Sequence, residues 1–453
     1  MFRYAPLAEI KHRASYLAGG LSGRTRFAAG RTSSFFTGAI ASFRETFDLQ
    51  RPTFNPQPIP MRDVYLDHAA TTPLEPDVLE AMHPYLTEHF GNASSVHAKG
   101  RRARVALDEA RETVAGCIGA EASEVVFTSG GTEADNFALR GVLRGAQGAG
   151  GGGRLVTSAA EHKAVLEPAE ALAEEGVSVS VLSPDERGVV LPQQVADALE
   201  DEKDGSGATL VSLMHTNNEV GTRTRLAEIA DVCHARDALL HTDAVQAAPD
   251  LDVEALGVDL ASLSAHKVYG PKGAGALYVR SGVELAPLVR GGSQERARRG
   301  GTENVAAVVG MAEALRRATD AAGERARRLR RLQQDLAERL RTAFGEAARI
   351  NTPLEADASA PHVLSVSFPP GEDESPLDGE MLLLNLDVEG VRASAGSACT
   401  SGALEPSHVL QAMGLQRETA AATVRFSFGK STTESDVAHA ADALETVVGR
   451  MRS

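Results

Sequence analysis

The chain has 453 residues, of which 43% are hydrophobic and 24% charged, and a formal net charge of -15. This length predicts about two or three domains. The acidic balance argues against nucleic acid or an anionic membrane as a main partner, because both attract basic patches. No apolar run approaches the roughly 18 residues that a membrane span needs. Three cysteines make no disulfide framework, so we expect a cytoplasmic enzyme in a reducing compartment.

The first 60 residues differ in composition from the rest. They hold eight Arg and Lys against three Asp and Glu, and seven of the fourteen Phe. A basic stretch rich in Arg, Ser and Ala has features of a transit peptide. It equally fits an upstream extension that never folds, with Met61 opening the first domain. We expect residues 1–60 to be an N-terminal extension, disordered or processed, outside the fold.

From about residue 100 to 280, short β-branched runs alternate with segments of helical spacing such as 133–144 and 226–236. This alternation predicts an α/β fold with a mainly parallel sheet between helices. A charged helix over 313–344 marks the passage to a second domain. We expect a large domain over 61–318, with 61–76 packing on a smaller α+β domain over 319–453. The seven expected strands are 125–127, 155–158, 177–182, 210–215, 239–241, 260–263 and 274–279.

Ligands of open α/β sheets bind beyond the carboxyl ends of the strands. After the first expected strand, residues 128–132 run into a helix, and Gly131 and Thr132 would present backbone N–H groups to a phosphate. Such a helix start is also typical of plain capping. His162, Asn218 and Asp243 follow three further strands, and such a residue alone is more often a cap or a satisfied polar contact.

The strand over 260–263 leads into Ser264, His266 and Lys267, followed by a turn rich in Gly and Pro. A single Lys beside Ser and His fits an amine held near a phosphate, although a surface Lys is the alternative. Together these strand ends offer a phosphate cradle, an imidazole, a carboxylate, the amide donors of Asn218 and Gln246, and one amine. Pyridoxal phosphate (PLP) needs this set, because a lysine amine bonds its aldehyde and a carboxylate keeps its pyridine nitrogen protonated.

Several ordered motifs extend this pattern along the chain. They are YLDHAATTP at 65–73, FGN at 90–92, FTSGGTE at 127–133, EHK at 161–163, NNE at 217–219, SAHKVYGPKG at 264–273, RGGT at 299–302 and SAGSACTSGALEP at 394–406. Over about residues 62–450 the chain resembles a cysteine desulfurase of the NifS and IscS group, which are class V, fold-type-I PLP enzymes. The resemblance implies a large domain with a seven-stranded sheet and a smaller domain that carries a catalytic cysteine.

The resemblance also implies residue roles and partners. Lys267 would form the Schiff base, His162 would stack on the ring and handle protons, and Asp243 would pair with the pyridine nitrogen. Thr302 would complete the phosphate site of a partner subunit, which implies a homodimer. The other implied contacts are Asn218 and Gln246 near the ring hydroxyl, and Gly131, Thr132, Ser264 and His266 at the phosphate. No metal site is expected.

Residues 392–402 are small, polar and glycine-bearing, which predicts a mobile exposed loop around Cys399. Cys117 and Cys233 lie in helical runs, where buried structural thiols are expected. The resemblance implies that the Cys399 thiolate attacks the γ-sulfur of L-cysteine, giving alanine and a persulfide. It further implies transfer to sulfur-acceptor proteins such as an iron–sulfur scaffold.

The substrate carboxylate needs a fixed cation, and bidentate geometry favours Arg. The resemblance implies Arg425 for this role with Asn92 as a helper, although Arg425 could instead be a surface residue on a strand. Two departures from the family pattern are the GTRTR sequence at 221–225, where a hydrophobic pair and Gln-Pro are frequent, and Ala265, where Gly is common.

Other functions remain open at this point. The chain could be a related PLP lyase or aminotransferase that acts on selenocysteine or another amino acid. It could also be a PLP-binding scaffold that only organises iron–sulfur assembly.

Overall fold

The computed structural model describes residues 63–145, 153–200, 208–371, 375–396 and 405–453. These residues belong to one unit, Ile59–Ser453. All seven predicted strands of the large sheet are present. They are β2 (Val125–Thr128), β3 (Arg154–Ser158), β4 (Ser178–Leu182), β5 (Thr209–Ser212), β6 (Leu239–Asp243), β7 (Leu260–Ser264) and β8 (Gly275–Val279).

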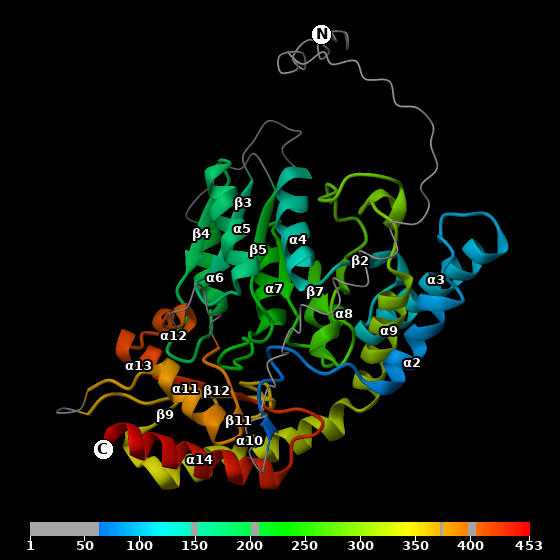
Figure 1. Cartoon of the computed structure of the whole chain (residues 1–453). Helices are drawn as coiled ribbons and strands as arrows, with labels where there is room; N and C mark the ends of the chain where they lie inside the picture. Colours follow the sequence, from blue (N-terminus) through cyan, green and yellow to red (C-terminus); the bar gives the residue numbers. More distant parts are fainter. Residues whose placement is uncertain (1–62, 146–152, 201–207, 372–374, 397–404) are drawn as a thin grey trace, which may run out of the picture. The chain divides into compact units, whose positions relative to one another are not determined.

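The sheet has the strand order β2-β8-β7-β6-β5-β3-β4 (Figure 1). The neighbours from β7 to β4 pair in parallel, whereas β8 runs antiparallel to both β2 and β7. The predicted mainly parallel α/β sheet is therefore confirmed. Because the parallel strands all point the same way, their carboxyl ends meet along one edge, where the polar residues of the sequence motifs follow.

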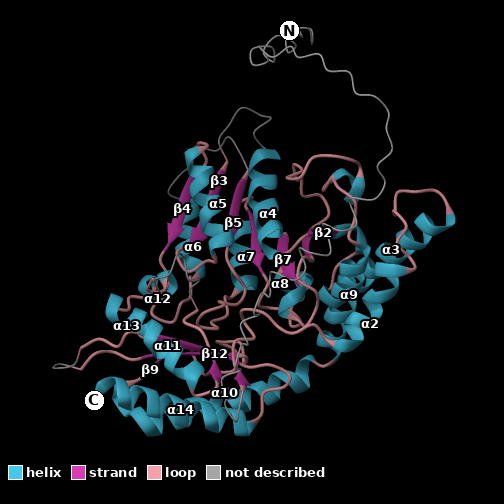
Figure 2. Ribbon diagram, in the orientation of Figure 1, coloured by secondary structure: helices cyan, strands magenta, loops and turns pink. Residues whose placement is uncertain are grey.

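Successive strand residues enter two different cores, as the pleat requires. Val126, Leu155 and Leu210 pack with α4 (Gly131–Gly145) and α5 (Lys163–Glu174). Their neighbours Val125, Val156 and Val211 pack with helices of the opposite face. Those helices include α3 (Ala98–Ile118), α6 (Pro192–Glu200), α7 (Leu226–His234), α8 (Val253–Leu256) and α9 (Val305–Asp320). Burial on both faces explains the apolar strand sequences, and Figure 2 shows the strands between these helices.

The predicted single helix over 313–344 is wrong, because two helices occupy this stretch. Helix α9 ends at Asp320 and α10 spans Ala322–Phe344, with Ala321 between them at φ -99° and ψ 3°. The helices bury their apolar faces in different places. Leu315 joins the core of the large sheet, whereas Leu332 and Leu336 join the core of the C-terminal part.

The C-terminal part has an antiparallel sheet of β9 (Arg349–Ile350), β10 (Val363–Ser367) and β12 (Thr423–Ser427), in the order β12-β10-β9. A second small sheet pairs β1 (Val64–Tyr65) in parallel with β11 (Val391–Arg392). The first described residues therefore lie beside the C-terminal part. The predicted domain boundaries themselves stay predictions. The remaining helices are α2 (Pro76–Thr87), α11 (Gly379–Val388), α12 (His408–Ala412), α13 (Arg417–Ala421) and α14 (Glu434–Arg452).

Among the described helices, none combines the length and the apolar character that crossing a membrane requires.

Candidate active site

A cavity of about 460 Å³ opens at the carboxyl ends of the parallel strands. Residues from the N-terminal segment and from the C-terminal part close it, among them Asp67, Ala69, Ala70, Ser394 and Gly396. Ten residues predicted from the sequence line this cavity: Gly131, Thr132, His162, Asn218, Asp243, Gln246, Ser264, His266, Lys267 and Arg425.

Lys267 ends the short 3-10 helix η3 (Ala265–Lys267), directly after β7. Its Nζ donates hydrogen bonds to the carbonyl oxygens of Ala69 at 2.6 Å and Ala70 at 2.9 Å. Burial, with a smaller contribution from Arg425, lowers the pKa of Lys267 to about 8, against the opposing pull of Asp243. A substantial fraction of this amine is therefore neutral and nucleophilic near physiological pH.

His162 caps the N-terminus of α5, where its Nδ1 accepts a hydrogen bond from the Ala164 N–H at 3.1 Å. In the neutral ring this contact assigns the proton to Nε2. Burial lowers the pKa of His162. The negative charge of Asp243 opposes this lowering, whereas the positive charge of Lys267 strengthens it. A neutral imidazole with an Nε2–H group therefore lines the cavity.

Asp243 is the last residue of β6, two residues beyond the predicted strand end at 241. The strand continues because Thr242 and Asp243 pair with Ala261 and Ser262 of β7. One carboxylate oxygen, Oδ1, accepts the Val245 N–H at 2.9 Å. Burial raises the pKa of Asp243, so a nearby cation would stabilise its ionised form.

Gly131 and Thr132 open α4, and the first N–H groups of a helix have no partners within the helix. Ser264 and His266 face the same cavity from the end of β7. The Nδ1 atom of His266 lies 3.1 Å from the Thr71 hydroxyl, and burial followed by Lys267 lowers the pKa of His266 to about 4. These groups form a neutral, donor-rich end of the cavity.

Gln246 and Asn218 contribute amides on the other strand ends. The Gln246 Nε2 donates to the Ala69 carbonyl at 2.8 Å, which also accepts from Lys267. The backbone carbonyl oxygen of Asn218 accepts a hydrogen bond from Arg425 Nη1 at 2.9 Å. The Ala69 carbonyl thus fixes an amide and the amine relative to each other.

Arg425 lies at the centre of β12 and is 4% exposed, which excludes the alternative of a surface arginine. Its Nη2 pairs with Asp67 Oδ1 at 2.7 Å. Its buried Nε has no hydrogen-bond partner among the described residues. Neighbouring Val424 and Phe426 enter the core of the C-terminal part, as predicted, while Arg425 faces the cavity.

Comparison with known proteins agrees with this geometry. The family model of class-V aminotransferases matches residues 64–439. The chain is 42% identical over 398 residues to cysteine desulfurase IscS of Dictyoglomus turgidum, across 86% of this chain and 96% of that protein. The chain belongs to the class-V aminotransferase family, within its cysteine desulfurase group. The predicted resemblance is thereby confirmed.

Other members of this group agree. Cysteine desulfurase IscS of Aeromonas hydrophila is 44% identical over 396 residues, across 86% of this chain and 93% of that protein. A solved structure described as a NifS-like protein superposes with a TM-score of 0.76 at 36% identity, covering 86% of this chain and all of that one. The fold-type-I architecture is therefore shown.

Three predicted site residues of this class-V family member are not among the residues that line the cavity. Asn92 lies in an exposed turn before α3, where its Oδ1 accepts the Ser94 N–H at 2.8 Å. Thr302 is exposed. Cys399 lies outside the described residues, as does most of its predicted loop. Of the other cysteines, Cys117 is only half-buried in α3, whereas Cys233 is buried in α7, where burial raises its pKa to about 12.

The sequence motifs did not predict three carboxyl groups at or near the cavity, of which Asp135 and Glu161 are buried and Asp67 is partly exposed. Asp67 pairs with Arg425, a residue 358 positions away. Asp135 lines the cavity at 1% exposure, and burial followed by Asp243 raises its pKa well above the ordinary value. Glu161 accepts the Met214 N–H at 2.8 Å, and burial likewise raises its pKa. For Glu161 the available sequence signal was placement, because it lies three residues beyond the end of β3, whereas Asp135 lies seven residues beyond the end of β2 and inside α4.

Proposed function

We propose that the chain binds PLP at Lys267 and converts L-cysteine to L-alanine, with the sulfur passing to Cys399 as a persulfide. The decisive observation is the Lys267 amine, with a pKa of about 8, in one cavity with buried Asp243, His162 and Arg425. Relatives that are 39% to 44% identical over 86% of the chain are named cysteine desulfurase.

The residues present fit the cofactor. The cavity offers an amine with a lowered pKa, a buried carboxylate that a cation would stabilise, and a neutral imidazole. In this proposal Lys267 bonds the cofactor, Asp243 pairs with its ring nitrogen and His162 lies against the ring. Gln246 and Asn218 lie near its hydroxyl, and Gly131, Thr132, Ser264 and His266 hold its phosphate. When bound, PLP draws electrons away from bonds at the α-carbon of an amino acid.

Arg425 supports the choice of an α-amino acid as substrate. A guanidinium has five N–H donors, and the contacts to Asp67 and Asn218 leave the buried Nε unpaired. Because Arg425 lines the cavity, a substrate carboxylate bound there would meet its guanidinium. Lys267 then moves the α-proton, because its pKa lies near physiological pH.

The sulfur step needs a nucleophilic thiol. The proposed nucleophile, Cys399, follows Gly396 by three residues, and Gly396 lines the cavity. The Cys399 thiolate attacks the substrate γ-sulfur, a new S–S bond forms and the bond from carbon to sulfur breaks. The electron pair of the broken carbon–sulfur bond stays with the three-carbon fragment, which takes up protons and leaves as alanine.

We infer a homodimer in which the exposed Thr302 of one subunit reaches the phosphate site of the other. The persulfide passes to an acceptor such as an iron–sulfur scaffold protein. A thiol that must stay reduced between turnovers fits the cytoplasm.

The proposal is tested with purified protein, L-cysteine and a reductant, by measuring alanine and sulfide together. We expect equal amounts of both products, and loss of both when Cys399→Ser is used. Cys117→Ser is the matched control and should keep full activity, because that thiol lies in α3 and does not line the cavity. Alanine formation at the full rate by Cys399→Ser would show that the proposed nucleophile is wrong.

A further inference from the structure

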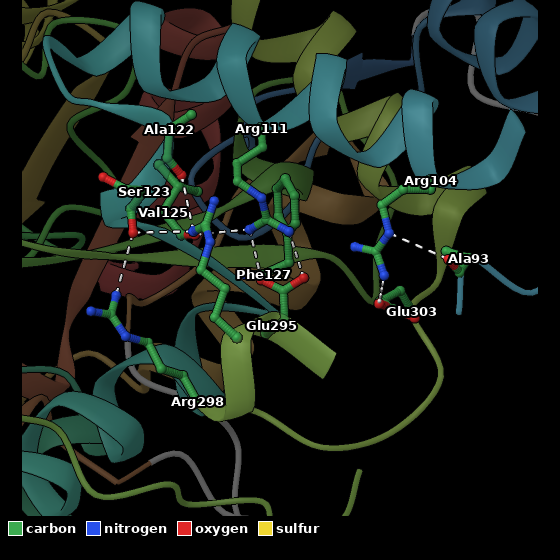
Figure 3. A network of polar contacts seen from close by, with 11 residues as sticks. Ala93, Arg104, Arg111, Ala122, Ser123, Val125, Phe127, Glu295, Arg298 and Glu303 are labelled. Atoms are coloured by element: carbon green, nitrogen blue, oxygen red, sulfur yellow. Dashed lines mark hydrogen bonds and ion pairs between the residues drawn. The ribbon is translucent and has the colours of Figure 1, made fainter. Parts of the chain in front are cut away.

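A buried ion pair joins α3 to the segment after β8 (Figure 3). Arg111 and Glu295 form two hydrogen bonds of 2.7 Å, and their side chains are 5% and 3% exposed. Glu295 also accepts the Phe127 N–H at 2.9 Å, and Arg111 donates to the Val125 carbonyl at 2.8 Å. The pair therefore ties this segment to β2, the strand that leads into the loop over 128–132.

The segment turns sharply at this ion pair. Glu295, Arg296 and Ala297 have φ of 46°, 58° and 64°, a left-handed conformation that residues other than glycine rarely adopt. In addition to the Glu295 ion pair, the Arg296 side chain holds the turn, because it donates hydrogen bonds to the carbonyl oxygens of Ala122 and Ser123. Three consecutive left-handed residues persist only where the surroundings dictate them. The turn thus sets the direction in which the chain continues to Arg299.

The side chain of Arg299 reaches the start of α4. Its Nε lies 2.9 Å from Glu133 Oε1 and its Nη2 lies 3.4 Å from Oε2. Glu133 directly follows Thr132 and also accepts the Ser129 N–H at 2.8 Å. The segment after β8 therefore holds the loop over 128–132 at both ends, through Glu295 at its entry and Arg299 at its exit.

The position of Glu133 creates an electrostatic conflict. A carboxylate in the first turn of a helix occupies the positive end of the helix dipole, which is also where a phosphate binds. Burial alone would raise the pKa of Glu133, but hydrogen bonds from Arg299 and Ser129 lower it, so the carboxylate is ionised at neutral pH. Without Arg299, this negative charge would repel a phosphate at Thr132.

We propose that Arg299 is a positioning residue of the phosphate site, because it offsets and orients Glu133 so that the start of α4 accepts a dianionic phosphate. The inference rests on the proposed function. The Arg111–Glu295 ion pair fixes the left-handed turn, and the turn in turn fixes the position of Arg299.

The test compares PLP with pyridoxal, which lacks the phosphate, in binding to the full-length protein freed of cofactor. Arg299→Gln should bind PLP about threefold to tenfold more weakly, an effect expected for one uncompensated charge near a partly exposed site. Pyridoxal binding should not change. Adding Glu133→Gln to Arg299→Gln should restore PLP binding, since the unpaired carboxylate is then gone. Raising the salt concentration should reduce the loss.

The matched control is Arg298→Gln, which alters the adjacent arginine, whose contact is the Ser123 carbonyl. It should leave both affinities unchanged. Arg299→Lys keeps the positive charge and should bind PLP nearly as well as the wild-type protein. This variant keeps the inference testable if Arg299→Gln folds poorly. Equal losses for PLP and pyridoxal, or a double variant as weak as Arg299→Gln, would overturn the inference. Absence of PLP binding by the wild-type protein would instead overturn the proposed function.

Discussion

Lys267 lies where two carbonyl oxygens accept hydrogen bonds from its amine while burial disfavours its charge. The neighbouring Arg425 adds to the lowering of its pKa, and Asp243 and Asp67 oppose it. The net result is a pKa of about 8, below the ordinary 10.5. The protonated form dominates below this pH and the neutral amine above it. Reactivity toward an aldehyde therefore rises with pH through this range.

We predict that the rate at which cofactor-free protein bonds PLP increases with pH with a midpoint near 8. The absorbance of the bound cofactor, followed after rapid mixing at a series of pH values, measures this rate. A midpoint near that of an ordinary lysine would contradict the environment described for Lys267.

Arg425 lines the cavity with a guanidinium whose Nη1 and Nη2 each donate one hydrogen bond within the protein, which leaves further N–H donors. We predict that Arg425→Lys raises KM for L-cysteine about tenfold to a hundredfold, because a lost charge-assisted hydrogen bond costs ~1.5–3 kcal/mol. The value of kcat should fall less. Steady-state kinetics with Arg417→Lys, an exposed arginine of α13, as control measures the effect. An unchanged KM would remove Arg425 from carboxylate binding.

At the scale of elements, the loop from β2 to α4 depends on close backbone packing against β8. A Cβ atom added at Gly275 would lie 2.6 Å from both the Gly130 Cα and the Leu263 carbonyl oxygen. Neither backbone atom can move without displacing a strand or the loop. Glycine at this position therefore lets β8 support the start of α4.

We predict that Gly275→Ala lowers the free energy of unfolding by about 1–3 kcal/mol, as overpacking does, and weakens PLP binding. The matched control is Gly116→Ala in α3, where an added Cβ meets nothing within 4 Å. That change should stabilise the protein by about 0.5–1 kcal/mol through helix propensity. Chemical denaturation of both variants measures the difference, and equal effects would contradict the packing argument.

The elements that could be predicted from sequence are those with strong local patterns. Short β-branched and apolar runs marked all seven strands, including the partly exposed β4, and polar residues beyond the strands marked ten residues that line the cavity. Strand ends were less accurate: β5 ends at Ser212 rather than at residue 215, because Leu213 and His215 bond to residues of β6 outside the regular ladder. The break at Ala321 also escaped prediction, since helical spacing continues through it.

Other features depend on contacts that no local pattern records. Asp67 meets Arg425 across 358 residues, and Ala69 contributes only a backbone carbonyl. Nothing in the sequence around Glu295 indicates a left-handed turn, because its partner Arg111 lies in another helix. Long-range ion pairs and backbone acceptors of this kind require the fold itself.

At the scale of the whole molecule, the cavity is closed by the N-terminal segment and by β12 of the C-terminal part. The exposed Thr302 does not line it, which accords with the proposed contribution to a second subunit. We predict a homodimer by light scattering. Lys267→Ala and Thr302→Ala should each impair activity, and mixed, reassociated subunits should recover about a quarter of wild-type activity, because one site of each hybrid dimer is intact. A monomer with full activity would contradict this.

The proposed reaction requires the covalent attachment of PLP in this cavity. The direct measurement is reduction of the loaded protein with borohydride, which fixes the cofactor to the amine that holds it, followed by peptide mass mapping. We predict a single modified peptide carrying the adduct at Lys267, and none in Lys267→Ala. An adduct on any other lysine, or a protein that holds no PLP, would contradict the account.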